Sequence, residues 1–102
     1  GKKKEMDPSK GRITLGKAVI KINHMEPEMA EYAVREAEGA LETSFNERRI
    51  AQLMKAAFEK RFKSNWHCVV GRDFGAWVTH EVGRFLFFYI GQKGFLIWAT
   101  PS

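Results

Sequence analysis

The sequence predicts an α+β domain in which two helices pack on an antiparallel β-sheet. Two observations predict it. The middle of the chain repeats apolar residues at helical spacing, and the part after Phe62 consists of short β-branched or aromatic runs separated by glycines. The chain has 102 residues, of which 44% are hydrophobic, so it is long enough for one small core and too apolar for intrinsic disorder.

A short strand is expected before the helices, over residues 17–22. In this segment alanine or isoleucine alternates with lysine or valine. A period of two residues is typical of a strand with one buried face. We therefore predict a short strand here, at the edge of the sheet.

The first helix is expected to begin at Pro27, because proline suits the first helical turn and glutamates near a helix N-terminus are favourable. From Met29 to Ser44 small and apolar residues recur at helical spacing and form a narrow stripe. Gly39 lies within this helix. It weakens the helix by ~1 kcal/mol relative to alanine but does not end it.

The second helix is expected to begin after Asn46, whose side chain suits the N-cap position. From Ile50 to Arg61 apolar residues follow the i, i+3, i+4, i+7, i+8 pattern closely. Residues 26–42 carry six glutamates and one arginine, whereas residues 47–63 carry six basic residues and two glutamates. The opposite charges indicate that the two helices are neighbours, although each exposed ion pair contributes little.

Four strands are expected after the helices. Their β-branched and aromatic runs cover residues 66–70, 74–81, 85–90 and 95–99. Glycines separate the runs, and the segment Gly-Gln-Lys-Gly at residues 91–94 is typical of a hairpin turn. The predicted order is therefore one strand, two helices and four strands, with no internal repeat.

The last two strands are apolar on both faces. Side chains alternate along a strand, and in residues 85–90, Phe-Leu-Phe-Phe-Tyr-Ile, both alternating sets are apolar. Two short helices can cover only one face of the sheet. We favour a second copy of the chain, packed sheet on sheet about a two-fold axis, as the cover of the other face. The alternatives are irregular alternation near the strand ends and a surface for a different partner.

The formal net charge of +5 invites a nucleic-acid interpretation, but the charge is unevenly distributed. Residues 1–16 hold five basic and two acidic residues, and we expect them to form a basic disordered tail before a domain over residues 17–102. Between residues 66 and 98 only three residues are basic, too few to interleave with stacking aromatics. A small basic nucleic-acid-binding module is therefore the alternative function and not the preferred one.

The composition also favours one cellular location. A single cysteine, Cys68, cannot form an internal disulfide, which indicates a reducing compartment. The longest uncharged apolar run has six residues, too short to span a membrane, and we expect no signal sequence, because no apolar stretch follows the lysines at residues 2–4. We therefore expect a cytoplasmic protein without a membrane partner.

His67, Cys68 and His80 suggest a thiol nucleophile or a metal site. Adjacent residues of a regular strand point to opposite faces, so His67 and Cys68 cannot share one site. No metal-binding spacing is present, and a cysteine followed by two valines is typical of an inert buried thiol. We expect no enzymatic activity, no metal and no cofactor, and a cysteine-dependent enzyme is the rival class.

Residues 74–80 are the segment most suggestive of binding. Gly75 and Ala76 are small and leave room for another backbone to approach. An exposed strand edge offers unpaired amides and carbonyls, to which a peptide can add as an extra strand. The alternative is an ordinary interior strand.

Residues 65–81, Asn-Trp-His-Cys-Val-Val-Gly-Arg-Asp-Phe-Gly-Ala-Trp-Val-Thr-His-Glu, closely resemble the signature of the small dynein light chains. The likeness spans residues 17–100 without a gap. It implies a strand-exchanged, two-fold homodimer in which the strand at residues 74–79 crosses to pair with the sheet of the other chain. It also implies two symmetric grooves between the chains. Each groove takes a short peptide, centred on Gln and flanked by Thr, as an added antiparallel strand.

The resemblance also assigns roles to single residues. Glu47 matches the group that receives the peptide Gln, with Arg48 in place of the usual Lys, and His67 matches an interface histidine. Phe74 and Thr79 are expected at the dimer interface together with His67. The expected floor of the groove is Phe87, Tyr89 and Leu96. The peptide-binding residues that the resemblance implies are Glu47, Arg48, Arg72, Asp73, Phe74, Gly75, Ala76, Trp77, Val78, Thr79, His80, Phe87, Tyr89 and Leu96.

Some residues depart from the family pattern and affect ligand preference, not the backbone mode of binding. Where the family usually has Asn, this chain has Asp73, which adds a negative charge. Ala76 replaces the usual Ser and lacks its hydroxyl, and Trp77 replaces the usual Tyr. The other departures are Ile22 for Asn, Phe45 for a polar residue, Phe87 for Tyr and Gly94 for Ala.

The resemblance implies a non-enzymatic hub that serves as a subunit of the dynein motor, as a dimerisation aid for its partners, or as both. The expected partners are a second copy of the chain, the dynein intermediate chain and other proteins with short disordered motifs. The expected location is the cytoplasm and the cytoskeleton, in the microtubule-associated dynein complex.

Overall fold

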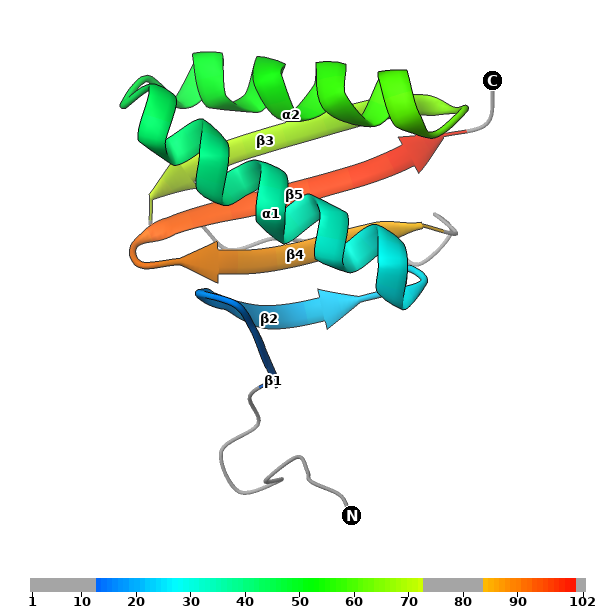
Figure 1. Ribbon diagram of the computed structural model, residues 1–102, viewed down its shortest axis with the longest axis horizontal. Helices are drawn as coiled ribbons and strands as arrows, with labels where there is room; N and C mark the ends of the chain where they lie inside the picture. The colour runs from blue at the N-terminus through cyan, green and yellow to red at the C-terminus, as the bar shows by residue number, and fades with distance from the viewer. Residues whose placement is uncertain (1–12, 73–83, 101–102) are drawn as a thin grey trace.

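Both helices lie on one face of a five-stranded sheet, so the molecule has two layers (Figure 1). The computed structural model describes residues 13–72 and 84–100. Along the chain the elements are β1 (Ile13–Leu15), β2 (Ala18–Asn23), α1 (Pro27–Thr43), α2 (Glu47–Arg61), β3 (Asn65–Arg72), β4 (Phe85–Ile90) and β5 (Lys93–Thr100). This arrangement confirms the predicted α+β class with two helices on an antiparallel sheet.

The described strands lie in the order β1-β2-β4-β5-β3, and each neighbouring pair is antiparallel. β5 pairs with β4 on one side and with the full length of β3 on the other. Among the described strands, β1 and β3 therefore form the two edges of the sheet. The strand predicted over residues 74–81 lies outside the described residues, so its exchange with a second chain stays a prediction.

Two expectations for the start of the domain differ from the structure. Residues 13–15, which the sequence assigned to the tail, form β1 and pair with β2 across a turn at Gly16, whose φ is 58°. β2 therefore lies between β1 and β4 and is not an edge strand. Three residues are too few for alternation to be recognised, and this strand is stabilised by pairing and by packing of Leu15 against the core. Residues 1–12 of the predicted tail lie outside the described residues.

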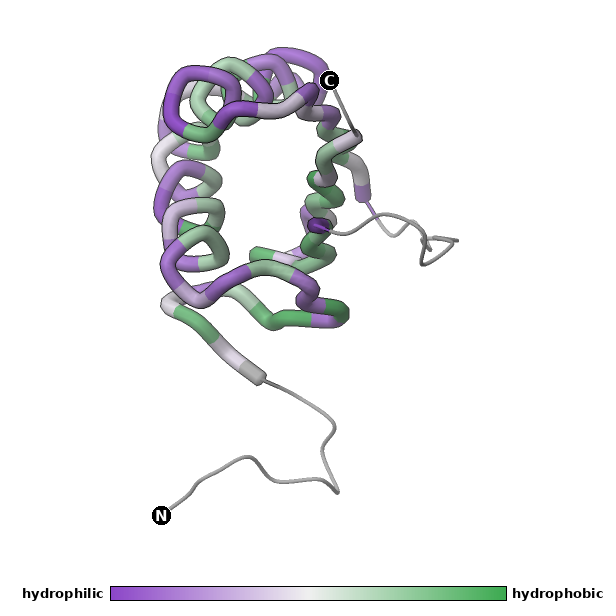
Figure 2. The backbone as a smooth tube through the Cα atoms, turned by 90° about the vertical axis from the view of Figure 1, so that its right-hand side faces the viewer, coloured by the Kyte–Doolittle hydropathy of each residue, from purple (hydrophilic) through white to green (hydrophobic). Residues whose placement is uncertain are grey.

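α1 begins at Pro27 as predicted and packs a stripe of small residues against the sheet. Hydrophilic and hydrophobic residues alternate along it, as Figure 2 shows for both helices. The Glu38 carboxylate accepts a hydrogen bond from the Lys17 backbone N–H at 3.1 Å and ties the helix to the β1–β2 turn. The buried residues of α1 are Met29, Ala30, Ala33, Val34, Ala37 and Ala40.

Asn46 caps α2, as predicted. Its side-chain oxygen accepts a hydrogen bond from the Arg49 backbone N–H at 2.9 Å, which satisfies one of the free donors at the helix start. The Arg61 guanidinium lies 3.1 Å from the Glu28 carboxylate, so the two helices are neighbours as their charges indicated. Both side chains of that pair are largely exposed, and it stabilises the fold little. The buried residues of α2 are Ile50, Met54 and Phe58.

Aromatic rings dominate the core between the two layers. Phe88 and Phe95 stack across β4 and β5 with 5.0 Å between ring centroids. The rings of Phe58 in α2 and Trp66 in β3 have centroids 4.8 Å apart. The Trp66 Nε1–H donates a hydrogen bond to the Phe62 carbonyl oxygen at 3.1 Å. Burying one large side chain contributes ~1.5–3 kcal/mol. These contacts therefore fix α2 against β3 and set the position of the site described next.

Candidate functional site

The face of the sheet away from the helices, here called the outer face, is apolar across β4, β5 and β3. Cross-strand partners share a face, so the register defines rows of side chains on it. One row consists of Phe85, Trp98 and His67. The next row consists of Phe87, Leu96 and Val69. The alternating residues Leu86 and Ile97 belong to the core under the helices, which confirms that the sheet is apolar on both faces.

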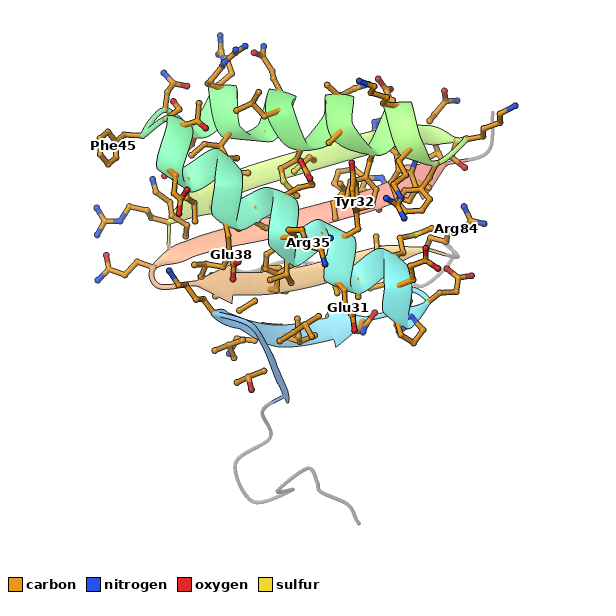
Figure 3. All side chains as sticks on the ribbon, in the orientation of Figure 1. Glu31, Tyr32, Arg35, Glu38, Phe45 and Arg84 are labelled. Carbon is orange, nitrogen blue, oxygen red and sulfur yellow. The ribbon has the colours of Figure 1, made fainter. Side chains whose placement is uncertain are left out.

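Exposure differs along the outer face. Phe85 and Phe87 are buried, whereas Leu96 is half-buried and Val69 is 45% exposed. Besides Val69, Phe45 is the other exposed large apolar side chain among the described residues. It lies in the α1–α2 connection and points away from the fold (Figure 3). The outer face therefore carries an apolar strip that no helix covers, in which Val69 is exposed and Leu96 is half-buried.

His67 lies on the outer face of β3. Its ring stacks on Trp98 with 5.3 Å between centroids and 26° between planes. Its Nε2 atom lies 3.0 Å from the Thr100 hydroxyl oxygen. These contacts hold the imidazole in one orientation. The role of His67 in a dimer interface stays a prediction, and its position on the apolar outer face agrees with it.

The three residues expected to form the floor of the groove share the outer face. The rings of Phe87 and Tyr89 have centroids 5.5 Å apart, and Leu96 is the cross-strand partner of Phe87. The Lys21 ammonium lies 5.9 Å from the Tyr89 ring centroid, within reach of a cation–π interaction. The structure thus brings the predicted floor residues together.

β3 presents an edge to which a further strand can add. It pairs with β5 without interruption from Asn65 to Arg72, and no other described strand pairs with it. An edge strand directs backbone donors and acceptors outward, and an extended chain can continue the sheet there. Of the two edges among the described strands, β3 with eight residues is the longer, and β1 has three, so β3 offers the longer edge for strand addition.

Glu47, the residue predicted to receive the peptide Gln, forms an ion pair with Lys93. The Lys93 Nζ atom donates to Glu47 Oε2 at 2.7 Å, and the two side chains are 24% and 37% exposed, respectively. The pair connects the first residue of α2 to the first residue of β5. Arg48, the next residue of α2, is exposed. Glu47, a predicted peptide-binding residue, is thus already paired with a cation, Lys93.

Sequence reasoning missed Lys93 because it placed residues 91–94 in the hairpin turn. The turn consists only of Gly91, whose φ is 62°, and Gln92, so Lys93 already belongs to β5. No contact can be predicted for a lysine in a turn. In a strand, the pairing register fixes which residues lie beside the lysine. No spacing in the sequence relates Lys93 to Glu47, because 46 residues separate them.

Arg72 ends β3 directly opposite Lys93, and its Nη2 atom donates to Gln92 Oε1 at 2.5 Å. Glu47, Arg72, Gln92 and Lys93 therefore gather at the end of the sheet that holds the β4–β5 turn, on the left in Figure 1. We call these four residues the polar end cluster. It contains two of the residues predicted for the groove, Glu47 and Arg72.

The predicted site residues fall into two described groups on opposite sides of the sheet. Glu47 belongs to the helix layer, whereas the floor residues lie on the outer face. A single chain therefore does not bring Glu47 and Leu96 into one groove. The remaining predicted residues, which lie outside the described residues, are Asp73, Phe74, Gly75, Ala76, Trp77, Val78, Thr79 and His80.

Cys68 faces the core. It packs against the buried cluster from β3, and burial raises the pKa of its thiol to about 12, so the thiol stays protonated at neutral pH. The neighbouring His67 contacts Trp98 and Thr100 on the opposite face. These positions agree with the expected inert thiol and separate it from the imidazole that a cysteine nucleophile needs.

Clusters of metal ligands and membrane-spanning helices are both absent from the part of the chain that the structure describes. No three His, Cys, Asp or Glu side chains gather there as they would around a metal ion. No helix in residues 13–72 and 84–100 is both long and apolar enough to cross a membrane.

Comparison with known proteins identifies the family. A family model described as dynein light chain type 1 matches residues 17–100. A curated dynein light chain of Schistosoma mansoni is 43% identical over 84 residues, which cover 82% of this chain and 94% of that relative. The chain therefore belongs to the dynein light chain family, as the resemblance in residues 65–81 indicated.

Solved structures share the fold. The dynein light chain-like domain of the Fasciola hepatica calcium binding protein FhCaBP2 has a TM-score of 0.74 at 19% identity, over 87% of this chain and 97% of that domain. The DLC like domain of CsTAL3 has a TM-score of 0.72 at 19% identity, over 88% of this chain and 100% of that domain. At these identities the likeness concerns the fold alone.

Proposed function

We propose that the chain is a non-enzymatic, homodimeric adaptor that binds short linear peptides as an added β-strand. The observation that carries the proposal is the apolar outer face, because both helices lie on the other side of the sheet (Figure 2). No helix covers this face, on which Val69 is exposed and Leu96 is half-buried. A second copy, packed outer face to outer face about a two-fold axis, supplies the missing layer.

The separation of the site residues supports a groove shared by two chains. The floor residues lie on the outer face, which meets the partner in such a dimer. Glu47 and Arg72 lie in the polar end cluster, beside the edge strand β3. A groove that combines the edge of one chain with the floor of the other unites both groups. Two-fold symmetry then gives two equal grooves.

The edge strand β3 supports recognition through the main chain. In this proposal the segment 74–79 of one chain adds to β3 of the other, and the peptide adds to that segment. Main-chain pairing tolerates varied side chains, while Glu47 reads a Gln at the centre of the peptide. The proposed partners are the dynein intermediate chain and other proteins with short disordered motifs, bound in the cytoplasm at the microtubule-associated dynein complex.

Isothermal titration calorimetry with a Gln-centred, Thr-flanked peptide tests the proposal. We expect one peptide per chain, and loss of binding when proline replaces a residue whose amide donates to the sheet, because proline has no backbone N–H. The matched control peptide carries proline where the amide points away from the sheet. Equal binding of both proline peptides would rule out strand addition, and absence of binding by every peptide would rule out the function.

A further inference from the structure

We propose that a groove between β1 and α1 is a docking site for a basic segment, and that its occupant is the N-terminal segment of the same chain, residues 1–12. The groove has a volume of about 210 Å³. It contains none of the residues assigned to the proposed peptide groove, so the two sites are distinct. The residues that line it are Leu15, Gly16, Glu31, Val34, Arg35 and Glu38.

The groove has an apolar floor and a fixed wall. Val34 is buried, and Leu15 packs against the core. The β1–β2 turn forms one wall and is held to α1, because the Lys17 backbone N–H donates to the Glu38 carboxylate at 3.1 Å. Gly16 of this turn has a φ of 58°, and a Cβ there would lie 2.9 Å from Glu38 Oε2. A preformed groove of this kind loses little freedom when it is filled.

Carboxylates border the groove on the side of α1. Glu31 and Glu38 lie on the flank of the helix toward β1 and β2 (Figure 3). Residues 26–42 as a whole carry six glutamates against one arginine, Arg35, which also lines the groove. Glu31 is exposed and takes part in no ion pair with another described residue. Its charge therefore remains available to a basic ligand.

The N-terminal segment has the complementary chemistry. Its sequence, Gly-Lys-Lys-Lys-Glu-Met-Asp-Pro-Ser-Lys-Gly-Arg, holds five basic and two acidic residues. Met6 has basic residues on both sides of it, and the unbranched side chain of methionine suits an irregular apolar floor. We therefore assign Met6 to the floor formed by Val34 and Leu15, with lysines of the segment beside Glu31 and Glu38.

The position of the segment makes this docking intramolecular. Residue 12 directly precedes β1, and Leu15 of β1 lines the groove. The stretch from Met6 to Ile13 spans at most about 25 Å when fully extended, enough to turn back along β1. A short link between two binding partners gives a millimolar effective concentration, so contacts too weak to hold a separate peptide suffice within one chain. This favours the chain's own segment over a second protein as the occupant.

Paramagnetic NMR of the full chain tests the inference. A nitroxide is attached to Ser9→Cys in the Cys68→Ala protein, which changes no charge of the segment. We expect broadening of the amide signals of Glu31 and Arg35 in α1, and none for Val69 on the opposite edge strand, β3. Raising the salt from about 0.1 M to about 1 M shortens the Debye length from about 10 Å to about 3 Å and should weaken the broadening.

Charge reversal identifies the groove. Glu31→Lys should abolish the broadening of Arg35, because it replaces an attractive charge in the groove by a repulsive one. Glu36→Lys is the matched control and should retain the broadening, because Glu36 lines a hollow between α1 and α2 and not this groove. Met6→Ser should also weaken the broadening. No broadening in α1 of the otherwise unchanged chain, or equal broadening with Glu31→Lys or with Met6→Ser, would overturn the docking as proposed.

A mixed sample separates docking within one chain from docking between copies. Isotope-labelled chains without the nitroxide are combined with unlabelled chains that carry it, and the signals of the labelled chains are recorded. We expect no broadening of Glu31 or Arg35 in this sample. Broadening there as strong as in the singly prepared protein would assign the groove to the segment of a second copy and overturn docking within one chain.

Discussion

Cys68 and His67 are adjacent residues of β3, and strand alternation gives them opposite surroundings. Cys68 packs on the core, while the His67 ring stacks on Trp98 at the outer face. Alternation is a local property of a strand, so the sequence alone could predict this separation. The contact of Lys93 with Glu47 depends on how α2 and β5 pack together, and no local signal encodes it.

We expect Cys68 to make the stability of the fold depend on alkaline pH. Burial raises the pKa of its thiol from 9.0 to about 12, so the unfolded chain loses this proton first as the pH rises. The contribution is fully present below pH 9.0 and is lost as the pH rises toward about 12. Urea denaturation at pH values of about 7.5 and 10 should therefore show a loss for the wild type that exceeds the loss for Cys68→Ala by ~1 kcal/mol.

The Cys68→Ala variant is the control in that measurement, because it retains the lysines and tyrosines that also titrate in this range. Equal losses of unfolding free energy in the two proteins would show that the thiol is not buried in the folded state.

Among the elements, α2 and β1 differ in how far the sequence could predict them. α2 has a capping residue at Asn46 and apolar residues at helical spacing, and both signals lie within the helix itself. β1 has three residues and exists through its pairing with β2. β5 begins two residues earlier than predicted, at Lys93, because the β4–β5 turn is shorter than its Gly-Gln-Lys-Gly sequence suggested. Contacts between elements, not local propensity, set these boundaries.

We expect Asn46→Ala to destabilise the fold by ~1 kcal/mol, because it removes the side-chain acceptor of the Arg49 N–H at the start of α2. Asn46→Asp keeps an acceptor at the same position and should cost much less. Chemical denaturation of the three proteins at equal concentration measures the difference. An Asn46→Ala protein as stable as the wild type would mean that the cap does not hold α2, and hence does not position Glu47.

For the molecule as a whole, the sequence predicted both the two-layer fold and the apolar outer face. The second prediction came from residues 85–90, where both alternating sets are apolar. The predicted groove could only partly be placed, because Glu47 and the floor residues lie on opposite sides of one chain. A site shared between two chains leaves no pattern in one sequence except a second apolar face of the sheet that the helices do not cover.

Sedimentation velocity at micromolar concentration tests most directly whether the outer face joins two copies of the chain. We expect the wild type to sediment at twice the mass of the chain, and Val69→Glu to sediment as a monomer, because it places a charge on the outer face of each copy. Phe45→Glu makes the same change at the other exposed apolar residue, away from the outer face (Figure 3), and should remain a dimer. A monomeric wild type, or a Val69→Glu protein that stays dimeric, would contradict assembly through the outer face.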